Sequence, residues 1–153
     1  MRICSISVLS VVVFACHAAL AADTAAERLI GVWLGSGRAS EAIYGTLTIS
    51  DKYISWPRTN NLQSCKTSYE IISTEISDTF PDEFPTHVHS VKGRVFTTVK
   101  LKLGEENCLA RSLGQPAAFL QFSFPSDMPG FAYVVEYDKA GKPHSELAFN
   151  KSQ

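Results

Sequence analysis

The strongest constraint on the fold is an alternation of apolar and polar residues that repeats every two positions. In residues 94–103, the odd positions from Val95 to Leu103 carry Val, Thr and Leu side chains, and Lys100 and Lys102 fall between them. Successive side chains of an extended chain point to opposite faces, so this pattern predicts a strand with one buried face. A helix would instead repeat its apolar positions every three or four residues.

The same alternation recurs between turn-forming residues, which predicts an all-β domain. We place strands at residues 30–34, 43–50, 53–56, 66–74, 94–103, 119–124, 131–138 and 145–150, after a short helix at residues 23–29. Short loops at residues 126–130 and 138–143 predict consecutive hairpins. We therefore expect an antiparallel up-and-down β-barrel of about eight strands with a short N-terminal helix.

The first 21 residues have the pattern of an export signal. Arg2 supplies a positive start, residues 6–14 are apolar but too few to span a bilayer, and Ala19-Leu20-Ala21 fits a signal-peptidase site. The alternative is lipid attachment at Cys16, which follows the small residue Ala15. We expect cleavage after Ala21, a periplasmic or secreted protein, and one domain over residues 22–153.

Two cysteines remain after that cleavage, Cys65 and Cys108. An even pair in an oxidising compartment usually forms a disulfide, and only one pairing is possible. The alternative of two reactive thiols lacks a C-x-x-C spacing or a neighbouring histidine. We predict a Cys65–Cys108 disulfide.

Gly31-Val32-Trp33 stands directly after the predicted helix, at the start of the first strand. This resembles the G-x-W signature of the lipocalin-like, or calycin, β-barrels. The resemblance implies that Gly31 and Trp33 are structural, that Trp33 plugs the closed end of the barrel, and that Lys151 packs across it. The other lipocalin sequence blocks are missing, and a Cys65–Cys108 pairing differs from the usual lipocalin disulfide.

Aromatic residues in the last strands suggest a barrel with a cavity, although a solid core is the alternative. They are Phe119, Phe122, Phe124, Phe131, Tyr133 and Tyr137. We take Trp56, Tyr69 and Tyr133 as the candidate lining of a barrel mouth, together with the irregular segment 75–92.

That segment contains His87 and His89, which we count as further candidates for ligand contact. Two histidines at i and i+2 could share a metal with Asp82 or Glu83. They supply only half of a tetrahedral shell, however, and a solvated loop explains them as well. We expect no metal site.

The composition points to binding and not to catalysis. The formal net charge of −1 gives no reason to expect nucleic acid as a partner, and no motif of a hydrolase, a metalloprotease, a phosphate loop or a cofactor site is present. We expect no cofactor and no stable membrane insertion. The leading hypothesis is capture of a small apolar or amphipathic molecule in the barrel mouth. The alternative is a protein-binding module, such as an inhibitor of a secreted enzyme that uses the Pro-rich loop 75–92.

Overall fold

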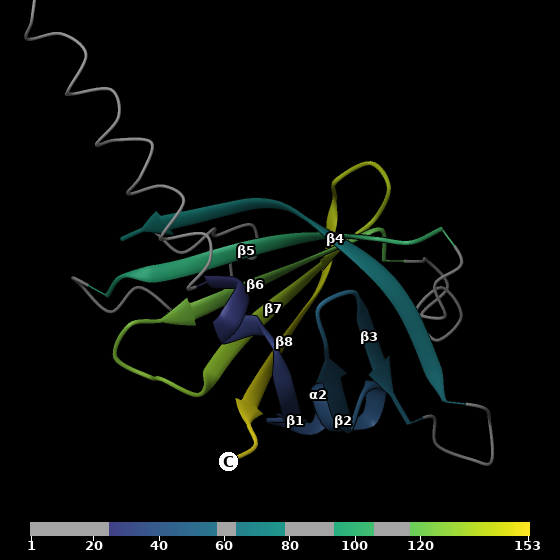
Figure 1. The fold of residues 1–153 in the computed structure, drawn as a ribbon, viewed down its shortest axis with the longest axis horizontal. Coiled ribbons are helices and arrows are strands. Elements are labelled where there is room, and N and C mark those ends of the chain that lie inside the picture. The colour runs from purple at the N-terminus through teal and green to yellow at the C-terminus, as the bar shows by residue number, and fades with distance from the viewer. Residues whose placement is uncertain (1–24, 58–63, 79–93, 106–116) are drawn as a thin grey trace, which may run out of the picture.

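The computed structural model describes residues 25–57, 64–78, 94–105 and 117–153, and its strands close into an antiparallel barrel (Figure 1). The strands are β1 (Gly31–Gly35), β2 (Thr46–Ile49), β3 (Tyr53–Trp56), β4 (Cys65–Ser77), β5 (Phe96–Leu103), β6 (Phe119–Pro125), β7 (Phe131–Tyr137) and β8 (Pro143–Lys151). Two short helices accompany them, α1 (residues 25–29) and α2 (Arg38–Ile43). The predicted fold class is confirmed.

Each strand pairs with the next one along the chain, and β1 pairs with β8 to close the ring. The barrel therefore has two distinct ends. The α1 end also holds the β2–β3 and β6–β7 turns, and Ser77 pairs there with Phe96. The α2 end holds the β7–β8 turn, and Trp56 pairs there with Cys65.

The inward side chains of the described strands are closely packed. A cavity of a few hundred Å³ would leave its lining residues accessible to water. The inward side chains are instead 5 % exposed or less: Trp33, Leu47, Ile49, Ile54, Trp56, Val99, Leu101, Leu120, Phe122, Phe124, Ala132, Val134, Leu147 and Phe149. Among the described residues, the solid-core alternative therefore describes the barrel better than a hollow one.

Trp33 is buried at the α1 end and is held on two sides. Its Nε1 donates a hydrogen bond of 2.8 Å to the carbonyl of Leu29, which joins the ring to α1. Lys151 Nζ lies 5.3 Å from the ring centroid and donates to the carbonyl of Arg28 at 2.8 Å. Burial and the nearby Arg28 guanidinium both lower the pKa of Lys151.

Gly31 leaves the space that Lys151 occupies in this arrangement. A Cβ atom at Gly31 would lie 2.7 Å from Lys151 Cε, and the residue has a φ of +141°, which favours glycine. Glycine at this position therefore lets the Lys151 side chain reach the Trp33 ring.

The strand predicted at residues 43–50 is wrong in its first half. Residues 38–43 form α2, and the chain leaves the helix through Gly45 at a φ of +61°, whose N–H donates to the carbonyl of Ser40. Glycine in this left-handed conformation is a common helix end. The apolar spacing of Ile43, Gly45 and Leu47 matched a strand, although only the residues from Thr46 onward are extended.

The predicted start of the irregular segment 75–92 is also wrong, because residues 75–77 belong to β4. They pair with β5 as far as Ser77, beyond the predicted strand end at Thr74. Residues 79–93 lie outside the described part of the chain. No helix of the described residues is long and apolar enough to cross a membrane, and the predicted signal segment is outside them.

Candidate functional site

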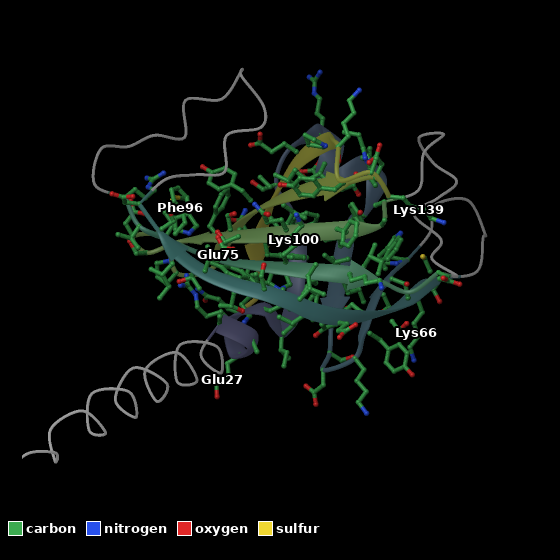
Figure 2. The ribbon with its side chains drawn as sticks, turned by 90° about the horizontal axis from the view of Figure 1, so that it is seen from above. Glu27, Lys66, Glu75, Phe96, Lys100 and Lys139 are labelled. Carbon is green, nitrogen blue, oxygen red and sulfur yellow. The ribbon has the colours of Figure 1, made fainter. Side chains whose placement is uncertain are left out.

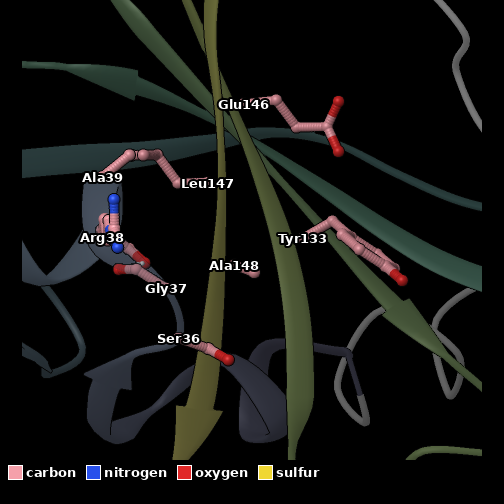
Figure 3. A pocket seen from close by; sticks show the side chains of 9 residues that line it. Ser36, Gly37, Arg38, Ala39, Tyr133, Glu146, Leu147 and Ala148 are labelled. Carbon is pink, nitrogen blue, oxygen red and sulfur yellow. Dashed lines mark hydrogen bonds between the residues drawn. The ribbon is translucent and has the colours of Figure 1, made fainter. Parts of the chain in front are cut away.

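A hollow of about 250 Å³ opens in the barrel wall where α2 meets β8 (Figure 3). The Ser36 N–H donates to the carbonyl of Ala148 at 2.8 Å. Among the described residues, this is the last backbone hydrogen bond to β8 as the chain leaves β1 for α2. Beyond it, α2 lies beside β8 in place of a strand. The hollow is lined by residues 36–40 on one side and by Tyr133 and residues 146–148 on the other.

The register of β7 and β8 determines which side chains reach the hollow. Tyr133 pairs with Ala148, and both alternate with inward residues such as Val134 and Leu147. In Figure 3 the Leu147 side chain extends toward Ala39, while Tyr133 and Glu146 extend from the other side of the strands. The Tyr133 ring is held by an edge-on contact with Phe131 at 4.8 Å between centroids.

The hollow combines apolar surface with charge. Arg38 forms no hydrogen bond or ion pair with any residue that the structure describes, so its guanidinium is available to a ligand. Glu146 lines the same hollow but already has an interaction of its own. Arg38 therefore attracts an anionic group, whereas the Glu146 carboxylate in the same lining repels one.

Directly inside the wall, Tyr44 enters the barrel at the end of α2. Its ring packs edge-on against Trp56 and Phe149, at centroid distances of 5.1 and 5.7 Å. Its hydroxyl donates to the Glu136 carboxylate, and Ser145 Oγ donates to the other carboxylate oxygen. Burial, followed by the charge of Glu136 and this hydrogen bond, raises the pKa of Tyr44 well above its usual value, which keeps the phenol protonated.

Glu136 is only 2 % exposed, so its carboxylate needs such hydrogen-bond partners. His144 Nε2 lies 3.6 Å from the same carboxylate. His144 occupies a bulge, because the β7–β8 register shifts between Glu136 and Tyr137, and its Nδ1 is buried without a hydrogen-bond partner among the described residues. These contacts form the Glu136 cluster, which consists of Tyr44, Glu136, Ser145 and His144.

The three aromatic candidates for a barrel mouth do not come together. Trp56 is buried inside the α2 end, and Tyr69 lies beside the β2–β3 turn, where its hydroxyl donates to the carbonyl of Ser50 at 2.7 Å. Tyr133 points outward and lines the hollow. Of the six aromatic residues in the last strands, only Phe122 and Phe124 belong to the interior core.

The segment predicted at residues 75–92 is attached at the end of the barrel opposite to Trp56, so the two do not line one mouth. Its flanking residues Ser77 and Phe96 pair at the α1 end, whereas Trp56 is at the α2 end. His87 and His89 lie outside the described residues, as does Cys108. Cys65 is buried at the start of β4. No three His, Cys, Asp or Glu side chains of the described ranges lie close enough together to hold a metal ion.

Sequence reasoning missed Arg38, Glu146 and the whole Glu136 cluster. For Glu136 a signal existed, since Ala132, Val134 and Glu136 share one face of β7 and the first two are apolar. A carboxylate on an otherwise apolar strand face indicates a buried polar group with partners. Arg38 and Glu146 have no comparable signal, because only the folded chain brings them near each other.

The described residues form an eight-stranded antiparallel barrel with a hollow in its wall. Comparison with known proteins adds nothing to this class, since no family model, no curated protein and no solved structure matches the chain.

Proposed function

We propose that this chain is an exported binding protein that takes a small amphipathic anion in the hollow between α2 and β8. The observation that carries the proposal is the lining of the hollow, to which Arg38, without a partner among the described residues, contributes together with Tyr133, Leu147 and Ala148. An acyl or aromatic body would cover the apolar surface, and an anionic head would pair with Arg38. The role is binding and not catalysis, and no cofactor is needed for it.

The packed core favours this site over the barrel interior. A ligand inside would have to displace side chains such as Trp56 and Phe149, which are almost fully buried. The hollow, at about 250 Å³, is slightly smaller than most sites for drug-sized molecules, which have about 300–1,000 Å³. We therefore expect a compact ligand with a short apolar body.

Three further features belong to the same proposal. Residues 1–21 direct export and are removed, a Cys65–Cys108 disulfide forms in the oxidising compartment, and the barrel is a lipocalin-like one. The contacts of Gly31, Trp33 and Lys151 at the α1 end support the likeness. The disulfide is supported by geometry, because Tyr69 pairs with Leu103 and the chain beyond Leu103 leaves β5 toward the end that holds Cys65.

Titration with octanoate, followed by amide chemical shifts, tests the ligand site. We expect shifts at residues 36–40 and 146–148, and Arg38→Gln should weaken binding at least tenfold. Lys139→Gln, in the β7–β8 turn, removes a positive charge away from the hollow and should leave binding unchanged. Shifts centred on the inward residues Leu101 and Phe122, or equal losses in both variants, would show that the hollow is not the site.

A further inference from the structure

Among the described residues, the second half of β4 has no strand partner along one of its edges, which is called the free edge. Of the residues of β4, only Cys65–Ser68 pair with β3, and the last backbone hydrogen bond on that side runs from the Tyr69 N–H to the carbonyl of Lys52 at 3.1 Å. From Glu70 to Ile76 the strand pairs with β5 alone among the described residues. Figure 1 shows β4 continuing well beyond β3, and in Figure 2 Glu75 lies far along it from Lys66.

This free edge carries large apolar side chains in contact with water. Ile71 is 39 % exposed, Ile72 is 46 % and Ile76 is 62 %, the highest exposure of any large apolar side chain in the described residues. Proteins usually protect such an edge with lysine or proline, because unpaired N–H and C=O groups attract other strands. Residues 70–76 contain neither lysine nor proline.

The charges on the edge indicate what it pairs with. Glu70 and Glu75 are exposed, and no basic residue occurs between Glu70 and Asp78 along the strand. Lys102 of β5 lies opposite Glu70, whereas Glu75 lies opposite the uncharged Thr98. Two copies of this chain joined edge to edge would bring four glutamates into one interface, and like charges near each other on paired strands are destabilising.

We propose that the free edge of β4, residues 70–76, binds an extended basic segment of a partner protein by strand addition. Backbone hydrogen bonds to the edge supply affinity that does not depend on sequence, and alternate apolar and basic side chains of the segment contact the isoleucines and the two glutamates. This surface is separate from the hollow beside α2. The two proposals therefore stand or fall independently.

Fluorescence anisotropy with a labelled synthetic peptide, KVTVKVTK, tests the proposal on the full mature chain. We expect saturable binding that Ile76→Lys weakens at least tenfold. The charge-reversed peptide EVTVEVTE should not bind. Hydrogen exchange should slow at the amides of residues 70–76 when KVTVKVTK is present.

Leu34→Lys is the matched control, because Leu34 is 44 % exposed on β1, a strand that is paired on both sides. It should leave peptide binding unchanged. Equal losses in Ile76→Lys and Leu34→Lys would overturn the proposal, as would slowed exchange elsewhere than at β4. A dimer of the free protein in light scattering that Ile76→Lys dissociates would assign the edge to a second copy and also overturn it.

Discussion

Tyr44 links the helix in the barrel wall to the buried Glu136 carboxylate. Its phenol satisfies one carboxylate oxygen and Ser145 satisfies the other. A buried carboxylate that loses such a donor keeps its desolvation cost without the compensating bond. The stability of the α2 end should therefore depend on the Tyr44 hydroxyl as well as on that of Ser145.

Tyr44→Phe removes only that hydroxyl and should lower the free energy of unfolding by about 1–3 kcal/mol. Urea denaturation measures the change. Tyr53→Phe is the control, because Tyr53 is 43 % exposed and its substitution should change stability by less than about 0.5 kcal/mol. Equal effects of the two substitutions would contradict a special role for Tyr44.

The same residue predicts a loss of stability in alkali. Since the pKa of Tyr44 is raised in the folded state, mainly by burial, the folded protein retains this proton where the unfolded chain loses it. Its contribution is complete below about pH 10 and falls as the pH rises toward the folded pKa. The lowered pKa of Lys151 acts in the opposite direction.

Comparing variants isolates the contribution of Tyr44. Between pH 9 and 11 the unfolding free energy of the wild type should fall more steeply than that of Tyr44→Phe. Parallel curves for the two proteins would assign the alkaline loss to other groups.

The sequence pattern predicts the strands well but predicts the segments between them poorly. Period-two alternation identifies β5 because its second half obeys it from Val99 to Leu103, although Phe96 and Thr98 on the other face are buried as well. It fails at residues 43–45, where a short helix happens to continue the same apolar spacing into β2. A six-residue helix has too few turns to show its own period, so Gly37 and Gly45 around it are the better signal.

Neither the hollow nor the free β4 edge could be predicted by reading one segment at a time. The hollow joins residues 36–40 to residues 146–148, which only barrel closure brings together. The edge exists because β3 is much shorter than β4, and relative strand lengths are among the least certain features of a sequence pattern.

Gly45→Ala tests the end of α2. Alanine at a φ of +61° should cost about 1–2 kcal/mol, because a Cβ atom strains the left-handed conformation. Thermal unfolding measures it. Gly45→Asn should recover part of the loss, since asparagine tolerates this conformation, and an alanine variant as stable as the wild type would contradict the observed helix end.

Trp33 packs against several distant parts of the barrel at its α1 end. Its ring contacts Phe124 of β6 at 5.7 Å between centroids, Lys151 of β8 and the backbone of α1. One side chain thus connects the first, sixth and last strands. Removal of the ring should affect the complete fold and not one local region.

Trp33→Ala should lower the free energy of unfolding by about 3–5 kcal/mol, because it removes a large buried side chain. Calorimetry should show one cooperative transition at a lower temperature. Val32→Ala, on the neighbouring exposed position, is the control. A Trp33→Ala protein of normal stability that no longer binds octanoate would make Trp33 a ligand-contact residue instead.

The proposed Cys65–Cys108 disulfide would close a loop of about 44 residues and contribute roughly 4 kcal/mol. Peptide mapping without reductant should recover the two cysteines in one linked fragment. Cys65→Ala should then melt at a lower temperature than the oxidised wild type. Free thiols in protein isolated from the exported compartment would contradict the bridge.

Every strand pairing except β1–β8 joins neighbours along the chain, so most of the sheet can form while synthesis continues. The remaining pairing places Trp33 opposite Lys151, near the two extremes of the described chain. Contacts between distant residues form slowly because a long loop must first close. Until the last strand is available, β1 keeps an open edge and the Trp33 ring lacks one of its neighbours. Ring closure is therefore the step at which a nascent chain is most exposed to aggregation, and a chaperone that delays folding until synthesis ends would act on that interval.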